Sequence, residues 1–315
     1  MALSGMCHWL YPSGMTKRLA SEMAADKTNT EVNCQPSSTM NDLSDKVQTV
    51  FKVLDRREKL AALPKLEEAL ASLNSKNSIN AQVDRDSTVF GFDTNAVIKI
   101  SSLSRSKSDN IIDFIKTLPK HHIIIPGQVA QETWNVITRD HHNSKIGQII
   151  TMQKTDVQSI RTLLGDVKAD RTFDLLQELR AIYQEYQPQN DSDSLRSLTS
   201  TITNLKAVAI CPFVPRAQFL QLAEVRQKTN TPPGFRDSGD NHGDYFVWAD
   251  FLLGVCMLNK PNITNIVLVT DDTKSDWSIR GVTHPMLSAE IDALCGKKFQ
   301  LWGVQDFSRY VELNI

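Results

Sequence analysis

Three carboxylates follow one apolar run near the C-terminal end of the chain. The segment VLVTDDTKSDW, residues 267–277, reads as a buried strand as far as Thr270 and then places Asp271, Asp272 and Asp276 in close succession. Packing gains nothing from charge at such a point, and like charges that lie close together repel unless a cation lies among them. The pattern therefore indicates a cation site at the end of this strand.

Carboxylates in three other segments occupy comparable positions. Asp93 ends the apolar run TVFGFD, Glu132 lies in the first turns of the helix expected after the strand HHIIIP, and Asp244 opens an expected apolar helix. Each of them taken alone also has a structural reading, as a cap of a turn or a helix. Because the carboxyl ends of parallel strands meet at one edge of a sheet, we expect these three carboxylates and the pair Asp271 and Asp272 to point into one crevice.

A cluster of carboxylates without histidine or cysteine suits a hard cation. Mg²⁺ and Mn²⁺ prefer oxygen ligands and keep several water molecules, and such ions clamp the attacking and leaving oxygens when phosphodiesters are hydrolysed. The sequence therefore predicts a Mg²⁺ or Mn²⁺ site. The candidate ligands and catalytic residues are Asp93, Glu132, Asp244 and either Asp272 or Asp271. Asp271 stays open as an alternative to its neighbour.

Four further residues near these acids are candidates for contacts with a substrate. Asn95 and Thr270 are placed to hydrogen-bond a carboxylate or a ligand of the site, and Lys274 and Arg236 are placed to contact phosphate. Each also has a structural reading. Asn95 fits a turn, Thr270 fits a strand end, and the two cations fit surface ion pairs with neighbouring aspartates.

The elements that must position these residues alternate between strands and helices. Strands are expected at 88–93, 121–126, 205–212, 265–270 and 298–304, helices at 108–120, 127–140, 145–186, 215–229, 244–258 and 285–295, and a loop at 187–194. Such alternation is typical of a parallel sheet covered on both faces. The predicted fold class is α/β, a three-layer α/β/α sandwich around a parallel sheet.

The flanking segments differ in pattern from this alternating part. Residues 1–40 are mixed and without periodicity, and we expect a flexible arm there. Residues 41–87 are expected to form a helical extension and a linker, with Pro64 dividing the helical part in two. The main domain is expected at 88–315, with a helical insertion at about 140–230.

Composition excludes several classes of protein. The hydrophobic and charged fractions, 41% and 23%, are those of ordinary globular proteins, and a net charge of −1 argues against a generally basic coat for nucleic acid. The 5 cysteines are scattered and form no CxxC pair, which argues against a structural zinc site or a disulfide framework. The chain lacks the apolar core of a signal peptide and any run of about 20 apolar residues. We therefore expect a cytoplasmic protein that does not enter a membrane.

The ordered segments FDTNAV, IPGQVAQE, PPGFRD, GDYFVW and VLVTDDTKSDW resemble the PIN-domain nucleases. The likeness is greatest to a bacterial PIN-like branch with a Pro-Pro-Gly loop, a GDxxxW motif and a VTDDxKxDW motif, and it extends over roughly residues 88–311. It implies that the four acids of the superfamily correspond to Asp93, Glu132, Asp244 and Asp272. The last of these follows from the Thr-x-Asp spacing of the family.

Two adjacent aspartates cannot both point the same way from an extended chain. With Asp272 facing the crevice, Asp271 is expected to cap the following turn or to bind through water. Asp276 is then expected to pair with a cation such as Lys274 or Arg280.

The resemblance implies a metal-dependent endonuclease that acts on RNA, with DNA as an alternative substrate. A toxin or phage-defence role fits this class, and so does RNA processing. Two other readings stay open: a catalytically weak or inactive module that binds nucleic acid or acts as a scaffold, and a phosphatase of the haloacid-dehalogenase type. The phosphatase would need an aspartate where Asn95 stands. Residues 1–87 are expected either to bind a protein partner or to cap the domain, and a homo-oligomer is also compatible with the sequence.

Overall fold

The computed structural model describes residues 38–57, 59–74, 83–143, 161–163, 165–236, 242–272 and 274–314. The chain divides into two compact units, residues 1–41 and 42–315, and the fold described below is that of the second unit. The predicted flexible arm lies almost entirely outside the described residues.

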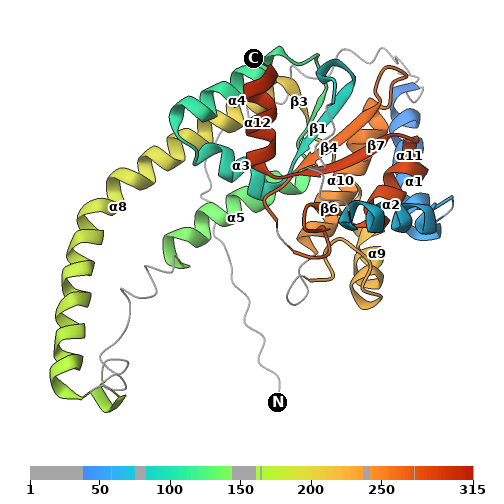
Figure 1. The fold of residues 1–315 in the computed structure, drawn as a ribbon. Coiled ribbons are helices and arrows are strands. Elements are labelled where there is room, and N and C mark those ends of the chain that lie inside the picture. The colour runs from blue at the N-terminus through green and yellow to red at the C-terminus, as the bar shows by residue number, and fades with distance from the viewer. Residues whose placement is uncertain are drawn as a thin grey trace, which may run out of the picture. The chain divides into compact units, whose positions relative to one another are not determined.

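Five parallel strands form the central sheet, in the order β3-β2-β1-β4-β7 (Figure 1). They are β1 (Thr88–Phe92), β2 (Ile123–Ile124), β3 (Ala209–Ile210), β4 (Asn265–Val269) and β7 (Lys298–Trp302). The chain runs from β1 outward to β3 and then returns to β4 on the other side of β1. The direction of winding therefore reverses between β1 and β4, and open α/β sheets bind ligands at such a point.

Alternation of side chains along the strands builds a separate core on each face of the sheet. One core joins Val89 and Leu268 to apolar side chains of α1 (Ser38–Arg56), α9 (Arg216–Lys228), α10 (Gly243–Leu258) and α11 (Pro285–Cys295). The other joins Phe90 and Val267 to α3 (Thr94–Ser101), α4 (Arg105–Thr117), α12 (Val304–Asn314) and the C-terminal part of α8 (Asp166–Val208). Helices thus cover both faces, and the predicted α/β class with a parallel sheet is confirmed.

The two N-terminal helices belong to the first of these layers. Val50 and Leu54 of α1 are buried in the core that α10 dominates, and α2 (Ala62–Asn74) lies along α11. The prediction that Pro64 separates the helices is wrong. The chain breaks at Arg57 and Lys59, which have left-handed backbone angles. Pro64 lies in the first turn of α2, where its missing N–H would have had no partner within the helix.

The predicted loop at 187–194 is also wrong, because α8 continues through it (Figure 1). Proline disfavours the interior of a helix because it lacks one N–H donor. The helix α8 nevertheless continues on both sides of Pro188. The C-terminal part of α8 packs on α3 and α4, and the hydroxyl of Ser197 donates a hydrogen bond to the carbonyl of Ser101 at 2.6 Å.

Several short elements have no counterpart in the prediction. They are α3, α12 and a two-stranded antiparallel hairpin of β5 (Ser278–Ile279) and β6 (Val282–Thr283). The helix α5 (Gly127–Asn143) follows β2 as predicted. Among the helices of the described residues, none combines the length and the apolar character needed to cross a membrane.

Candidate active site

Asp93 lies directly after β1 with its carboxyl group turned into the protein. The residue is 5% exposed. One carboxylate oxygen accepts a hydrogen bond from the N–H of Ala96 at 2.7 Å and so caps α3, and the other accepts one from the hydroxyl of Thr270. The Asp93 N–H donates to the carbonyl of Val269 at 3.1 Å, which joins the ends of β1 and β4. These contacts fix the carboxyl group at the point where the winding of the sheet reverses.

The pKa of Asp93 is raised from 3.8 to about 7. Burial is the main cause, because it disfavours the charged form. The hydrogen bonds from Thr270 and Ala96 oppose the rise, and the negative charges of Asp244 and Asp272 add to it. The Asp93 carboxyl group therefore holds its proton more tightly than a free aspartate does.

This raised pKa makes the stability of the protein depend on pH. The folded state keeps a proton that the unfolded state has lost, so the stabilisation is complete below about pH 4 and disappears as the pH rises through about 7. In EDTA the wild type is expected to lose stability between about pH 4 and pH 7 relative to Asp93→Asn, and the variant should be the more stable at pH 7 by more than about 1 kcal/mol. Calorimetry at both pH values measures this, and identical pH slopes for the two proteins would contradict it.

The turn after β4 directs its two adjacent aspartates to different partners. The Asp272 N–H donates to the hydroxyl of Thr270 at 2.9 Å, and Asp272 Oδ1 accepts from the Lys274 N–H at 2.8 Å. Asp271 Oδ1 instead accepts from the N–H of Val304 at 3.0 Å, at the start of α12. Asp271 therefore caps a helix that comes 33 residues later, and not the turn that follows it, while Asp272 belongs to the group around Asp93.

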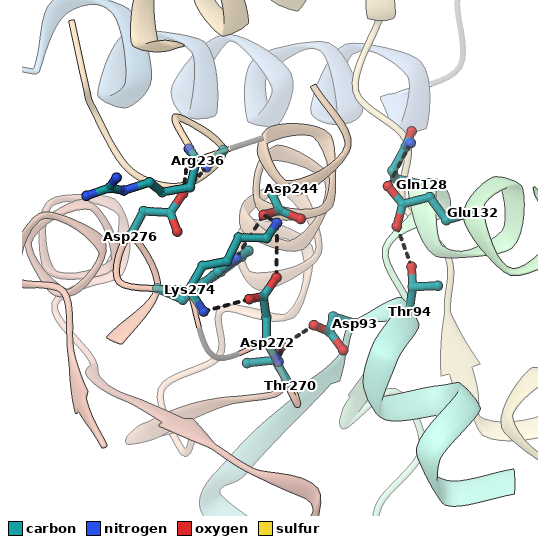
Figure 2. A network of polar contacts seen from close by, with 12 residues as sticks. Asp93, Thr94, Gln128, Glu132, Arg236, Asp244, Thr270, Asp272, Lys274 and Asp276 are labelled. Carbon is teal, nitrogen blue, oxygen red and sulfur yellow. Dashed lines mark hydrogen bonds and ion pairs between the residues drawn. The ribbon is translucent and has the colours of Figure 1, made fainter. Parts of the chain in front are cut away.

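Lys274 connects Asp244 and Asp272. Asp244 lies in the first turn of α10, and its Oδ2 is 2.6 Å from Lys274 Nζ and 3.2 Å from Trp277 Nε1. Asp272 Oδ2 is 3.2 Å from the same ammonium group. Figure 2 shows the lysine side chain between the two carboxylates, with Asp93 and Thr270 beside them. The structure thus brings together Asp93, Asp244 and Asp272.

Glu132 lies beside this group and is linked to it through Thr94. Its Oε2 accepts a hydrogen bond from the hydroxyl of Thr94 at 2.6 Å, and its Oε1 accepts one from the side-chain amide of Gln128 at 3.1 Å (Figure 2). Thr94 follows Asp93 in the chain. Both donors are neutral, so neither forms an ion pair with Glu132.

Asp250 fixes the start of the helix that carries Glu132. It is fully buried, forms a two-pronged ion pair with Arg216 at 2.8 Å, and accepts hydrogen bonds from the N–H groups of Gln128 and Val214, each at 2.8 Å. No feature of the local sequence marks this role, because the partners of Asp250 are separated from it by 34 residues or more.

The predicted substrate contacts are divided by the structure. Asn95 and Lys274 line an open depression of about 510 Å³ together with Lys99, Ser102 and Asp272. Thr270 lies deeper, against Asp93. Arg236 is not grouped with these residues. It lies beside Asp276 (Figure 2). Its guanidinium group packs over the ring of Phe235, 5.3 Å from the ring centre.

Among the described residues no ion pair joins Asp276 to Lys274 or Arg280, so the prediction of such a pair is wrong. Its Oδ2 accepts hydrogen bonds from the N–H groups of Gly234 at 2.9 Å and Arg236 at 3.3 Å. Backbone donors at the end of the Pro-Pro-Gly segment take the place of the expected side-chain cation. Gly234 has a φ of +94°, a left-handed angle that favours glycine.

A buried ion pair holds the same segment from the other side. Arg226 donates to Glu290 at 2.7 Å and to the carbonyl of Pro232, and Glu290 also accepts from the indole N–H of Trp248 at 2.7 Å. Arg226 is 2% exposed and Glu290 is not exposed at all. The Pro-Pro-Gly segment is thus tied to α9, α10 and α11, and through Asp276 to the turn that carries Lys274. Sequence reasoning missed both members of this pair.

The donor chemistry of the site fits a hard divalent cation. All the acids offer oxygen, and the charges of Asp244 and Asp272 add to the rise that burial causes in the pKa of Asp93. The side chains do not form a ready-made ligand set, however. In the part of the chain that the structure describes, no three histidine, cysteine or acidic residues are grouped closely enough to hold a metal. The ammonium of Lys274 lies between two of the predicted ligands.

The chain is similar to known proteins over part of its length. A family model described as a PIN like domain matches residues 142–288. No curated protein and no solved structure matches the chain. The matched stretch includes Asp244 and Asp272, whereas Asp93 and Glu132 precede it, so the match is shorter than the likeness that the motifs predict. The parallel α/β fold and this match together support a place in the PIN superfamily.

Proposed function

We propose that the protein is a metal-dependent endonuclease that hydrolyses phosphodiester bonds in RNA. The observation that carries this proposal is the meeting of Asp93, Asp244 and Asp272 at the carboxyl edge of β1 and β4, although they come from three separate segments. Crowded carboxylates at this point of an open sheet favour a ligand that carries positive charge. The similarity to PIN-like domains supports nuclease chemistry as the class of reaction.

In this proposal Asp93, Asp244 and Asp272 hold Mg²⁺ or Mn²⁺. When bound, such an ion stabilises the negative charge that develops at phosphorus and lowers the pKa of water. Thr270 donates to Asp93 and keeps its carboxylate oriented toward the crevice. The same hydrogen bond favours the ionised form of Asp93, which is the form that can act as a ligand.

Glu132 is the residue that we assign to orienting the attacking water or to holding a second ion. Its two oxygens each accept one hydrogen bond, which fixes the carboxylate and leaves further lone pairs available. Asn95, Lys99 and Lys274 line the adjacent depression and provide contacts for the phosphates of the strand. The resemblance to PIN-domain nucleases implies products with a 5′-phosphate and a 3′-hydroxyl.

The proposal is tested by cleavage of defined RNA and DNA oligonucleotides in Mg²⁺, Mn²⁺ or EDTA. We expect cleavage of RNA with either ion and none in EDTA. Binding of the ion should also raise the melting temperature, because a ligand at a hundred times its Kd stabilises the folded state by about 2.7 kcal/mol. Equal cleavage in EDTA would overturn the metal requirement, and cleavage of DNA alone would overturn the assignment of RNA.

The cellular role follows from which RNA is cut. A toxin or phage-defence effector cleaves RNA that growing cells need, whereas a processing enzyme cleaves a restricted set of precursors. Expression of the wild type and of Asp272→Asn in growing bacteria separates the two proposals. Arrest of growth by the wild type alone supports the first role, and normal growth with both proteins supports the second.

A further inference from the structure

Lys274 stands where a cation bound to Asp244 and Asp272 would have to lie. Its ammonium group is 2.6 Å from Asp244 Oδ2 and 3.2 Å from Asp272 Oδ2. Its own N–H donates to the other oxygen of Asp272, so the side chain folds back over the acid that lies two residues before it (Figure 2). The lysine therefore neutralises part of the charge of the site from within the same turn.

A divalent cation cannot join this arrangement without displacing the ammonium. Mg²⁺ lies about 2.1 Å from its oxygen ligands. Because Lys274 Nζ is 2.6 Å from Asp244 Oδ2, an ion bound to that oxygen would lie no more than about 4.7 Å from a lysine that kept its contacts. The side chains of Asp272 and Asp244 are only 8% and 20% exposed, so water screens the repulsion weakly. The Lys274 ammonium and the divalent cation require the same two carboxylate oxygens. Binding of the metal therefore has to displace the ammonium.

The Lys274 side chain can turn from the two acids into the adjacent open depression. The Lys274 side chain is 36% exposed and lines an open depression. The other residues of that lining are Asn95, Ile98, Lys99, Ser102, Asp271 and Asp272. Turning away from Asp244 would bring a second ammonium to the depression beside that of Lys99. Two ammonium groups on one side of an open depression attract the phosphates of a nucleic-acid strand.

We propose that Lys274 is a built-in competitor of the divalent cation, and that its displaced ammonium then binds a backbone phosphate of the substrate. The inference rests on the proposed function, because it assumes a metal at Asp244 and Asp272. Binding of the metal and binding of the nucleic acid should therefore be positively coupled. Each of them favours the conformation in which the Lys274 side chain is turned away from Asp244 and Asp272. An empty site stays closed by an ion pair, and the lysine becomes a substrate contact only in the loaded site.

Titration of the full-length protein with Mn²⁺, followed by calorimetry, tests the competition without any measurement of activity. Lys274→Met is expected to bind Mn²⁺ at least about tenfold more tightly than the wild type, because a like charge next to the ion is removed. Lys99→Met is the matched control and should change the affinity less than about twofold, because its charge lies among the residues of the depression and not on the two acids. Equal or weaker binding by Lys274→Met would overturn the inference.

A second variant and a second reading keep the test decisive. Lys274→Gln removes the charge but keeps a polar side chain. Its melting curve in EDTA shows whether this variant is folded before its affinity for Mn²⁺ is compared with that of the wild type. Lys274→Met and Lys274→Gln should both bind an uncleavable 2′-O-methyl RNA more weakly than the wild type in Mn²⁺. The affinity of both variants should also depend less steeply on salt concentration, by about one phosphate contact. An unchanged salt dependence would remove the phosphate contact from the proposal. If neither the wild type nor the variants bind Mn²⁺, the proposed function itself fails.

Discussion

Asp272→Asn is expected to lower the rate of RNA cleavage by roughly a hundredfold or more while the fold is retained, which is the scale of losing one preorganised electrostatic contact. Asp272 is the acid that faces Asp93 and Lys274 from the end of β4, so its charge acts directly on whatever cation the site holds. The amide oxygen of asparagine can still accept the hydrogen bond from the Lys274 N–H. Single-turnover cleavage at saturating Mn²⁺ measures the loss, and circular dichroism verifies the fold.

Asp271→Asn is the matched control for this substitution. Asp271 accepts a hydrogen bond from the N–H of Val304, and asparagine serves equally well as a helix cap. The variant is expected to keep its cleavage rate within a few-fold and to lose less than about 1 kcal/mol of stability. A larger loss of cleavage in Asp271→Asn than in Asp272→Asn would transfer the role of ligand to Asp271.

Arg226→Met is expected to lower the free energy of unfolding by about 3–5 kcal/mol, because it leaves a buried charge without its partner. Glu290 is fully buried and would keep only the hydrogen bond from Trp248. The carbonyl of Pro232 would lose its donor as well, so the Pro-Pro-Gly segment would loosen together with the ion pair. Urea unfolding, followed by fluorescence, measures the change.

An exposed ion pair provides the control for that measurement. Arg309 lies 3.6 Å from Asp306, and both side chains are well exposed. Arg309→Met should therefore change stability by less than about 1 kcal/mol. If Arg226→Met changed it as little, the buried pair would have no structural role. The double substitution of Arg226 by Met and Glu290 by Leu should recover much of the loss, because it removes both buried charges.

Local periodicity was sufficient to predict the elements that are strongly apolar. The helix at 285–295 has the predicted bounds, and α10 begins one residue before its predicted start. The pattern failed where a few residues favoured a loop but the longer segments on either side favoured a helix. The polar, proline-containing stretch at 187–194 is typical of a loop, yet helical residues on either side continue through it. The short helix α3 was missed because eight residues carry too little periodicity to recognise.

The convergence of the acids followed from topology rather than from any single motif. Once β1 and β4 are parallel neighbours, Asp93 and Asp272 must end at the same edge. The hydrogen-bond and ion-pair partners that hold the site in place could not be predicted from the sequence, for a different reason. Asp276 accepts from a backbone N–H 42 residues away, and Arg226 pairs with Glu290 at a separation of 64 residues. A sequence shows that such residues are polar, but the fold decides which distant group completes each hydrogen bond.

The hydrogen bond between Thr270 and Asp93 spans 177 residues, and this separation has a consequence for synthesis of the protein. At ribosomal rates of 5–20 residues per second, roughly 10–35 s pass between the translation of Asp93 and that of Thr270. During that time the nascent chain carries β1 without β4, and neither Asp244 nor Asp272 is in place at first. The site can assemble only after Thr270 and Asp272 have been translated. In the proposed nuclease, each new copy would thus stay inactive until the segment with Thr270 and Asp272 has been made.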